Sequence, residues 1–146
     1  MKLDNAVINF KKKYPLTIAW RLRKHTEVIT QHINPDETVL YGFCGQLNDY
    51  WYDIFYSCVV CLTNQRILIG QKKLFWGYKY ISITPDLFND LNLRAGLIFG
   101  NAIIDTINEK VVISNIDKRA LIEIETAISS YMMKEKQKYA SKLKRG

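Results

Sequence analysis

The chain has 146 residues, of which 48% are hydrophobic and 24% are charged. This composition is ordinary for one globular domain with a core, and it argues against a disordered protein. The formal net charge of +7 is uneven: residues 1–33 and 134–146 each carry a net charge of +5, whereas residues 34–133 carry −3. We therefore expect a mildly acidic body with basic ends that are either solvated or meet an acidic partner.

The first 33 residues predict helical structure. Apolar side chains recur at helical spacing from Leu3 to Tyr14 and again from Ile18 to Ile33. Pro15 suits the first turn of a helix and is unfavourable inside one. The sequence therefore predicts two helices, broken or kinked near Pro15, in an N-terminal extension of residues 1–33.

The middle of the chain predicts about seven short strands. Two runs rich in β-branched and aromatic residues flank Thr63-Asn64-Gln65 and predict a central hairpin. The first run is apolar on both faces, as in a strand that is covered on both sides. Alternation and turn residues mark the other strands. The predicted strands span residues 37–45, 54–62, 66–70, 74–83, 91–99, 102–107 and 111–114, with one short helical turn at 86–90 and a turn at Gly100-Asn101.

A final amphipathic helix follows the strands. Asn115 or Asp117 can cap it, and an apolar stripe runs from Leu121 through Ile124 and Ile128 to Tyr131. The stripe ends before residue 134, so residues 134–146 predict a frayed helix end or a disordered basic tail. Because one helix can cover the open end of a bent antiparallel sheet, the fold class is α+β, mainly β.

Three cysteines are present, Cys44, Cys58 and Cys61, without the pattern of a disulfide framework. Cys58 and Cys61 have the spacing of a redox or zinc pair, but residues three apart on a strand point to opposite faces. They therefore predict buried core thiols.

No secretory signal and no uninterrupted apolar run of roughly 18 residues, as a membrane span needs, is visible. We expect a cytoplasmic location, with a peripheral position at the inner membrane face as an alternative.

Several segments follow a known pattern in the same order along the chain. They are Glu37-Thr38-Val39-Leu40, the run from Cys61 to Ile69 with Leu62-Thr63-Asn64-Gln65-Arg66-Ile67-Leu68 at its centre, and Tyr80-Ile81-Ser82-Ile83. Together they resemble the bacterial pleckstrin-homology (PH)-like domains, especially the YokE-like group related to GRAM domains. The resemblance implies a PH-like barrel over residues 34–133, with two near-orthogonal sheets and a C-terminal helix plugging one end. It also implies a binding module rather than an enzyme.

The loop between the first two strands, residues 46–53, departs from one part of that pattern. PH domains that bind inositol phosphates gather Lys and Arg at this loop, because phosphate recognition needs cationic donors. Here the loop has no basic residue and contains Asp49 and Asp53. We therefore expect no phosphoinositide binding there. Its aromatic residues, Tyr50, Trp51 and Tyr52, either pack on the sheet or form a contact for a protein partner.

The sequence supplies no catalytic, metal or cofactor constellation. His25 and His32 are seven residues apart, whereas a helical metal pair usually stands three or four apart and zinc needs three or four ligands. Asp49 and Asp53 lack a nucleophile beside them. We predict a protein that is not an enzyme and holds neither a metal nor a cofactor.

Two binding functions follow from these observations. The first is an adaptor that binds a protein, or a second copy of itself, through an open sheet edge or through Tyr50, Trp51 and Tyr52. The second is peripheral binding to an anionic membrane through the basic ends, whose candidate contacts are Lys11, Lys12, Lys13, Arg21, Arg23, Lys24, Lys142, Lys144 and Arg145. Nucleic-acid binding by the same charges is less favoured, because the predicted fold is not a nucleic-acid module.

Overall fold

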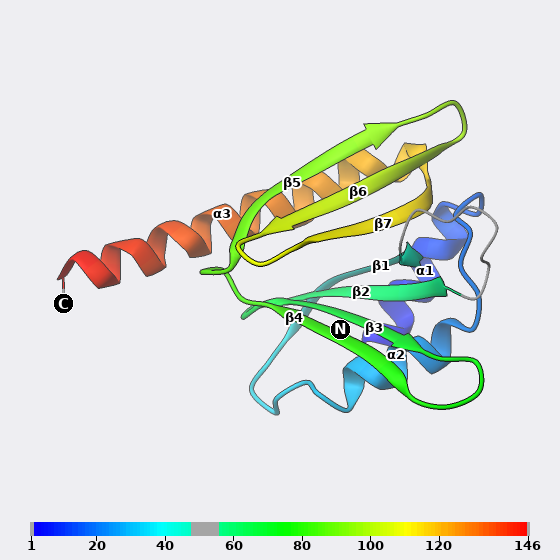
Figure 1. The fold of residues 1–146 in the computed structure, drawn as a ribbon, viewed down its shortest axis with the longest axis horizontal. Coiled ribbons are helices and arrows are strands. Elements are labelled where there is room, and N and C mark those ends of the chain that lie inside the picture. The colour runs from blue at the N-terminus through cyan, green and yellow to red at the C-terminus, as the bar shows by residue number, and fades with distance from the viewer. Residues whose placement is uncertain (1, 48–55, 146) are drawn as a thin grey trace.

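The computed structural model describes residues 2–47 and 56–145. These described residues form two N-terminal helices, seven strands and one long C-terminal helix, whose arrangement is drawn in Figure 1. The helices are α1 (Leu3–Lys13), α2 (Leu22–Thr30) and α3 (Leu121–Arg145), the last preceded by the 3-10 helix η2 (Lys118–Ala120). The strands are β1 (Val39–Leu47), β2 (Ser57–Thr63), β3 (Ile67–Lys72), β4 (Tyr78–Ile83), β5 (Phe88–Ala95), β6 (Phe99–Thr106) and β7 (Lys110–Asp117).

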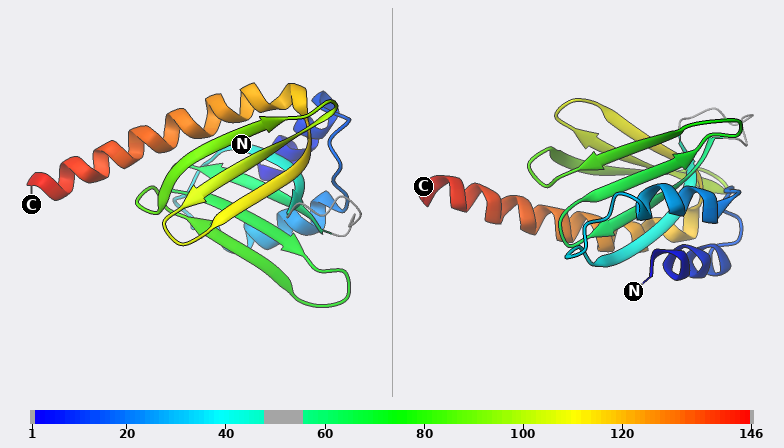
Figure 2. Two further views of the ribbon diagram at one scale, coloured as in Figure 1. Left: turned by 45° about the horizontal axis from the view of Figure 1, so that its top comes forward. Right: turned by 90° about the horizontal axis from the view of Figure 1, so that it is seen from below.

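The strands form one curled antiparallel sheet in the order β4-β3-β2-β1-β7-β6-β5. Its two halves are joined by a short junction, in which Gln46 pairs with Ser114 and Leu47 with Ile113. This short ladder lets the sheet bend into two layers (Figure 2). The predicted fold of seven antiparallel strands in two bent layers with a closing helix is therefore confirmed.

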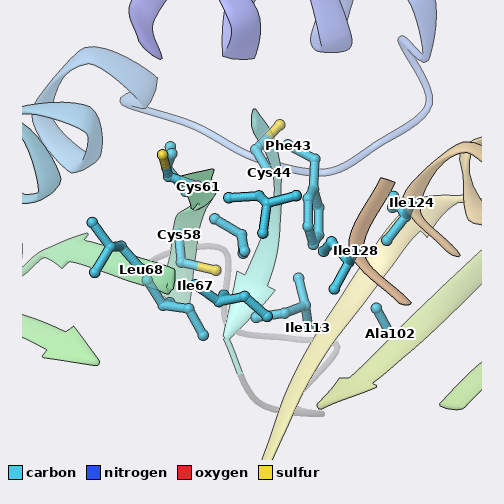
Figure 3. Close-up of a cluster of buried hydrophobic side chains, with 14 of the residues drawn as sticks. Phe43, Cys44, Cys58, Cys61, Ile67, Leu68, Ala102, Ile113, Ile124 and Ile128 are labelled. Carbon is cyan, nitrogen blue, oxygen red and sulfur yellow. The ribbon is translucent and has the colours of Figure 1, made fainter. Parts of the chain in front are cut away.

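Helix α3 fills the space between the two layers. Its apolar stripe places Ile124, Ile128 and Met132 in the core, fully buried. Figure 3 shows the first two of these near Phe43 of β1. The stripe predicted from the sequence is thus the plug of the half-barrel, and Asp117 caps η2 by accepting a hydrogen bond from the Arg119 N–H.

Helices α1 and α2 cover the other face of the β1–β4 layer. On β1, Gly42 faces Leu3 and Val7 of α1, whereas Gly45, on the opposite face, approaches Ile113 of β7. The layer is therefore covered twice, and β2 is buried along its whole length. This explains why the sequence of β2 is apolar on both faces.

The segment between α1 and α2 differs from the prediction. Pro15 does not open the second helix, which begins at Leu22, and residues 14–21 are irregular. The Ile18 N–H donates to the Asn115 carbonyl at 2.9 Å, and the Trp20 N–H donates to Ser57 Oγ at 2.9 Å. Ile18 and Trp20 thus bond to the sheet, in a segment where the prediction expected the first turns of the second helix.

Two predicted strands were too long. Residues 74–77 belong to the β3–β4 connection, and Gly96–Ile98 form the β5–β6 turn, which the Gly96 N–H closes by donating to the Phe99 carbonyl at 2.8 Å. Gly100-Asn101, predicted as a turn, lies inside β6. The predicted helical turn at 86–90 is also wrong, because β5 already starts at Phe88. Apolar alternation misled the prediction, since Leu97 continues the pattern although it is 87% exposed at the turn.

The C-terminal residues continue α3 to Arg145 rather than forming a disordered tail. Lys, Glu, Gln and Ala dominate this segment and favour helix without any buried stripe. Figure 1 shows these last turns projecting away from the sheet.

The segment Leu62-Thr63-Asn64-Gln65-Arg66 completes a buried ion pair. The Glu37 side chain is 0% exposed and accepts hydrogen bonds from Arg66 Nε and Nη2, both at 3.0 Å, and from Thr63 Oγ1 at 2.5 Å. Burial alone would raise the pKa of Glu37, but these hydrogen bonds hold it below its ordinary value. Arg66 also donates to the His32 carbonyl and to Ser82 Oγ, so it joins the end of α2 to β3 and β4.

We predict that Arg66→Met lowers the free energy of unfolding by about 3 kcal/mol, because it leaves the Glu37 carboxylate buried without its cation. Urea denaturation at neutral pH measures the change. The double variant Glu37→Leu/Arg66→Met removes both charges and is expected to recover part of the loss. A loss for Arg66→Met within the about 1 kcal/mol of a surface ion pair would contradict this role.

Candidate interaction surface

The aromatic candidates from the sequence, Tyr50, Trp51 and Tyr52, lie outside the described residues, as do Asp49 and Asp53. A protein contact through this loop therefore stays a prediction.

The basic candidates fall in three places. At the end of α1, Lys11 Nζ donates to the Pro15 and Thr17 carbonyls, and Lys13 pairs with Glu123 at 2.6 Å. Around the start of α2 and near the free end of α3 the exposed basic side chains are Arg21, Arg23, Lys24, Lys142 and Lys144, and Arg145 is the last residue of α3. Figure 1 places the free end of α3 opposite α1 and α2, so the structure does not bring the two basic ends together.

The connection between β3 and β4 carries two strongly exposed aromatic side chains. Phe75 is 83% exposed and Trp76 is 81% exposed, and their ring centroids lie 6.2 Å apart. Leu74 and Tyr78 beside them are also exposed. We call these four residues the aromatic tip.

Four cations lie on or beside the hairpin that carries the aromatic tip. Lys72, Lys73 and Lys79 flank it in the sequence, and Arg21, from the start of α2, contacts the strand that leads into it, with Nη1 3.5 Å from the Lys72 carbonyl oxygen. We call these four residues the cationic rim. The chain contains no acidic residue between Asp53 and Asp86, so the hairpin itself is purely basic.

A tight turn brings the aromatic tip to the end of the hairpin. Gly77 has φ +82°, a left-handed conformation that glycine adopts without a Cβ penalty. The Lys73 N–H donates to the Gly77 carbonyl at 3.1 Å and closes the turn. The sequence prediction missed this site because it placed residues 74–78 in a strand. Gly77 next to an aromatic run and flanking lysines was the available signal.

Helix α2 supports the hairpin from behind. Nδ1 of His25 accepts the Lys72 N–H at 2.8 Å, and the His32 ring stacks on Tyr80 at 3.9 Å. Gly70 permits this close packing, because a Cβ there would lie 2.7 Å from Cγ1 of Ile29. Burial, and then the charge of Arg21, lower the pKa of His25 to about 4, so its ring is neutral at physiological pH.

The two edges of the described sheet are β4 and β5. On β5, an irregular register between Phe88 and Asp90 and the charges of Asp90 and Arg94 guard the edge against pairing. On β4, Lys79 is the one charged residue, and the residues from Tyr80 to Ile83 carry no charge. The β4 edge is therefore the less protected of the two.

The cysteines are free and buried, as predicted. Burial raises the pKa of Cys44 and of Cys61 to about 12, so both thiols stay protonated and are poor nucleophiles. Figure 3 shows the sulfur atoms of Cys58 and Cys61 pointing apart. Within residues 2–47 and 56–145, no three metal-ligating side chains gather in one place.

Two clefts lie beside α1. One of about 210 Å³ lies between α1, β1 and α3, where Glu123 accepts hydrogen bonds from Lys13 and from the Tyr41 hydroxyl at 2.8 Å. The other, of about 530 Å³, is lined in part by Glu37, which is already paired with Arg66. In each cleft the Glu carboxylate belongs to an ion pair, and its pKa lies below the ordinary value. A general acid needs a raised pKa, so neither carboxylate fits that role.

Among the described helices, none combines the length and hydropathy that crossing a bilayer requires.

Comparison with known proteins gives one family and one solved structure. A family model described as "bacterial PH domain" matches residues 33–130. A crystal structure of a pleckstrin homology domain from Shewanella amazonensis SB2B aligns with 77% of this chain and 88% of its own, at 12% identity and a TM-score of 0.49. No curated protein matches the chain. The family match spans all seven strands and leaves α1 and α2 outside.

The neutral state of His25 makes stability pH-dependent. Unfolded His25 titrates near 6.5 and folded His25 near 4, so between these values the unfolded state binds more protons and unfolding becomes easier as pH falls. We predict a loss of about 2 kcal/mol between pH 7 and pH 5 from this group. His25→Asn, which keeps an acceptor near the Nδ1 position, is expected to show a smaller loss. Denaturant titrations at both pH values measure it, and equal losses in the two proteins would assign the effect to other groups.

Proposed function

The chain belongs to the bacterial PH domain family, and on that premise we propose that it is a non-catalytic adaptor that binds an extended segment of a protein partner along β4. PH-like domains commonly mediate binding. The observation that carries the proposal is the free outer edge of β4 in the described sheet. An exposed sheet edge can accept an added strand through main-chain hydrogen bonds.

The backbone of β4 is oriented for this role. The hairpin begins with the bond from the Lys73 N–H to the Gly77 carbonyl. Because bonded and non-bonded pairs alternate along an antiparallel ladder, the odd-numbered residues of β4 bond to β3. The N–H and C=O groups of Tyr78, Tyr80 and Ser82 therefore point toward the free edge.

The side chains along β4 support recognition of an alternating sequence. Tyr80 lies against His32 on the face that α2 covers, and Ile81 packs against the core on the other face. A partner strand would continue both faces, so we expect it to carry apolar or aromatic residues at alternate positions. A second copy of the chain paired through β4 is the self-associating form of the same proposal.

The described chemistry supports binding rather than catalysis. The thiols are buried and protonated, His25 accepts a backbone N–H, and the carboxylates of Glu37 and Glu123 sit in ion pairs. The predicted YokE-like, GRAM-related grouping and the cytoplasmic location remain predictions that agree with an intracellular adaptor.

We predict that Tyr80→Pro weakens binding of a peptide selected from a random peptide library at least about tenfold, because proline removes the outward N–H of the central edge residue. Tyr80→Ala is the matched control, since it also loses the tyrosine ring but keeps the N–H, and it is expected to retain most binding. Fluorescence anisotropy with the labelled peptide measures both. Equal weakening in the two variants would contradict strand addition at β4.

A further inference from the structure

We infer that the aromatic tip docks on an anionic lipid bilayer, with Phe75 and Trp76 in the interface and the cationic rim against the lipid phosphates. This surface is separate from the β4 edge used by the proposed adaptor function. It also differs from the basic ends singled out in the sequence, from which it takes only Arg21.

Exposure of the aromatic tip is the first observation. Phe75 and Trp76 are neighbours at the apex of a hairpin, and within the described structure most of their surface is open to solvent. Large aromatic side chains exposed together mark a surface that meets another phase or partner. Tryptophan favours the membrane interface in particular, since its ring is amphipathic.

The positive charge of the cationic rim favours an anionic bilayer as the partner. The four side chains of the cationic rim are Arg21, Lys72, Lys73 and Lys79, and the hairpin has no acid to neutralise them. An anionic bilayer offers an apolar interior below a layer of negative phosphates, and each basic residue near such a surface adds to the attraction. The exposed Arg23 and Lys24 of α2 extend the same charge.

The order of groups along the hairpin matches the order of layers in a bilayer. Lys72 lies opposite Tyr78, and Lys79 lies opposite Gln71. These two cations are therefore farther from the end of the hairpin than Phe75 and Trp76. Lysine side chains can extend along apolar surface and keep the amine at the phosphates. Rings at the apex therefore enter the interface while the amines remain at the headgroups.

The hairpin is placed and held for such a contact. Figures 1 and 2 show it at the end of the molecule away from the free end of α3, so that helix does not block its approach to a flat surface. The bond between His25 and Lys72 and the stack of His32 on Tyr80 fix it to α2. Little ordering is then required on binding, which favours affinity.

Vesicle co-sedimentation tests the apolar contact. With vesicles of phosphatidylcholine containing phosphatidylglycerol, the double variant Phe75→Ser/Trp76→Ser is expected to partition at least about tenfold more weakly than the intact chain. The matched control is Ile107→Ser, which alters a 63% exposed apolar residue at the β6–β7 turn. It is expected to bind like the intact chain, within about twofold. Equal effects of the two changes would overturn the inference.

Two charge variants test the cationic rim. Lys73→Glu/Lys79→Glu and Lys142→Glu/Lys144→Glu change the net charge equally, but the first pair lies beside the aromatic tip and the second near the free end of α3. Only the first is expected to lose binding, by about tenfold or more, and added salt is expected to weaken the intact chain. Equal losses in the two variants would indicate general charge attraction. If the intact chain bound pure phosphatidylcholine vesicles as well as anionic ones, the cationic rim would have no role in binding. Either result would overturn the inference.

Insertion of Trp76 can be observed directly. In a Trp20→Phe/Trp51→Phe background, Trp76 is the sole tryptophan, and we expect its emission to shift to the blue and to be quenched by lipids with brominated chains. Bound protein with unchanged emission would contradict insertion. Phe75→Ser/Trp76→Ser is expected to keep peptide binding at β4, which uses neither ring, so failure at the β4 edge and failure at the aromatic tip can be told apart.

Discussion

The structure depends on a sheet layer that is apolar on both faces. Strands β1–β3 bury nearly every side chain, so the layer needs a cover on each side. The other half of the sheet and α3 supply the inner cover, while α1 and α2 supply the outer one. Because α2 must lie against β3, it also determines where the β3–β4 hairpin can be, and the Glu37–Arg66 pair joins the end of that helix to the strands.

The two proposed surfaces are parts of one hairpin. Strand β4 leads directly from the aromatic tip, so a segment paired with β4 would begin beside the residues that meet the bilayer. If both proposals hold, such an adaptor would keep its partner at the membrane without any large conformational change. The free, basic end of α3 lies at the far end of the molecule and remains available for another contact (Figure 1).

The sequence predicted the parts of the fold whose side chains are buried. The double-sided run in β2 and the stripe from Leu121 to Tyr131 were predicted correctly, because burial imposes a period on the apolar residues. Boundaries failed where exposed apolar residues continued a strand pattern, as Trp76 and Leu97 do at hairpin turns. The same feature concealed the candidate site: exposed aromatic residues that serve a surface look like strand residues when only the alternation is visible.

The distribution of charge along the sequence also failed to predict where the basic residues lie in the fold. Lys13 is paired with Glu123, and the basic residues at the two ends of the chain lie far apart in the fold. Only Arg21 among the basic candidates joins the cationic rim, because the contact of α2 with β3 brings it to Lys72. That proximity depends on tertiary packing between segments about fifty residues apart, which no local pattern encodes.

The family match begins at Ile33, after α2 has ended. Yet His25 and His32 lie in and just beyond α2, and these two residues hold the hairpin that carries the aromatic tip. Arg21, which completes the cationic rim, also precedes the matched region. The proposed docking surface thus combines a hairpin of the PH-like domain with a helix outside the residues that the family model matches. The proposal therefore applies to this chain in particular, because a domain of the same family without α2 would have neither the fourth cation nor the support behind the hairpin.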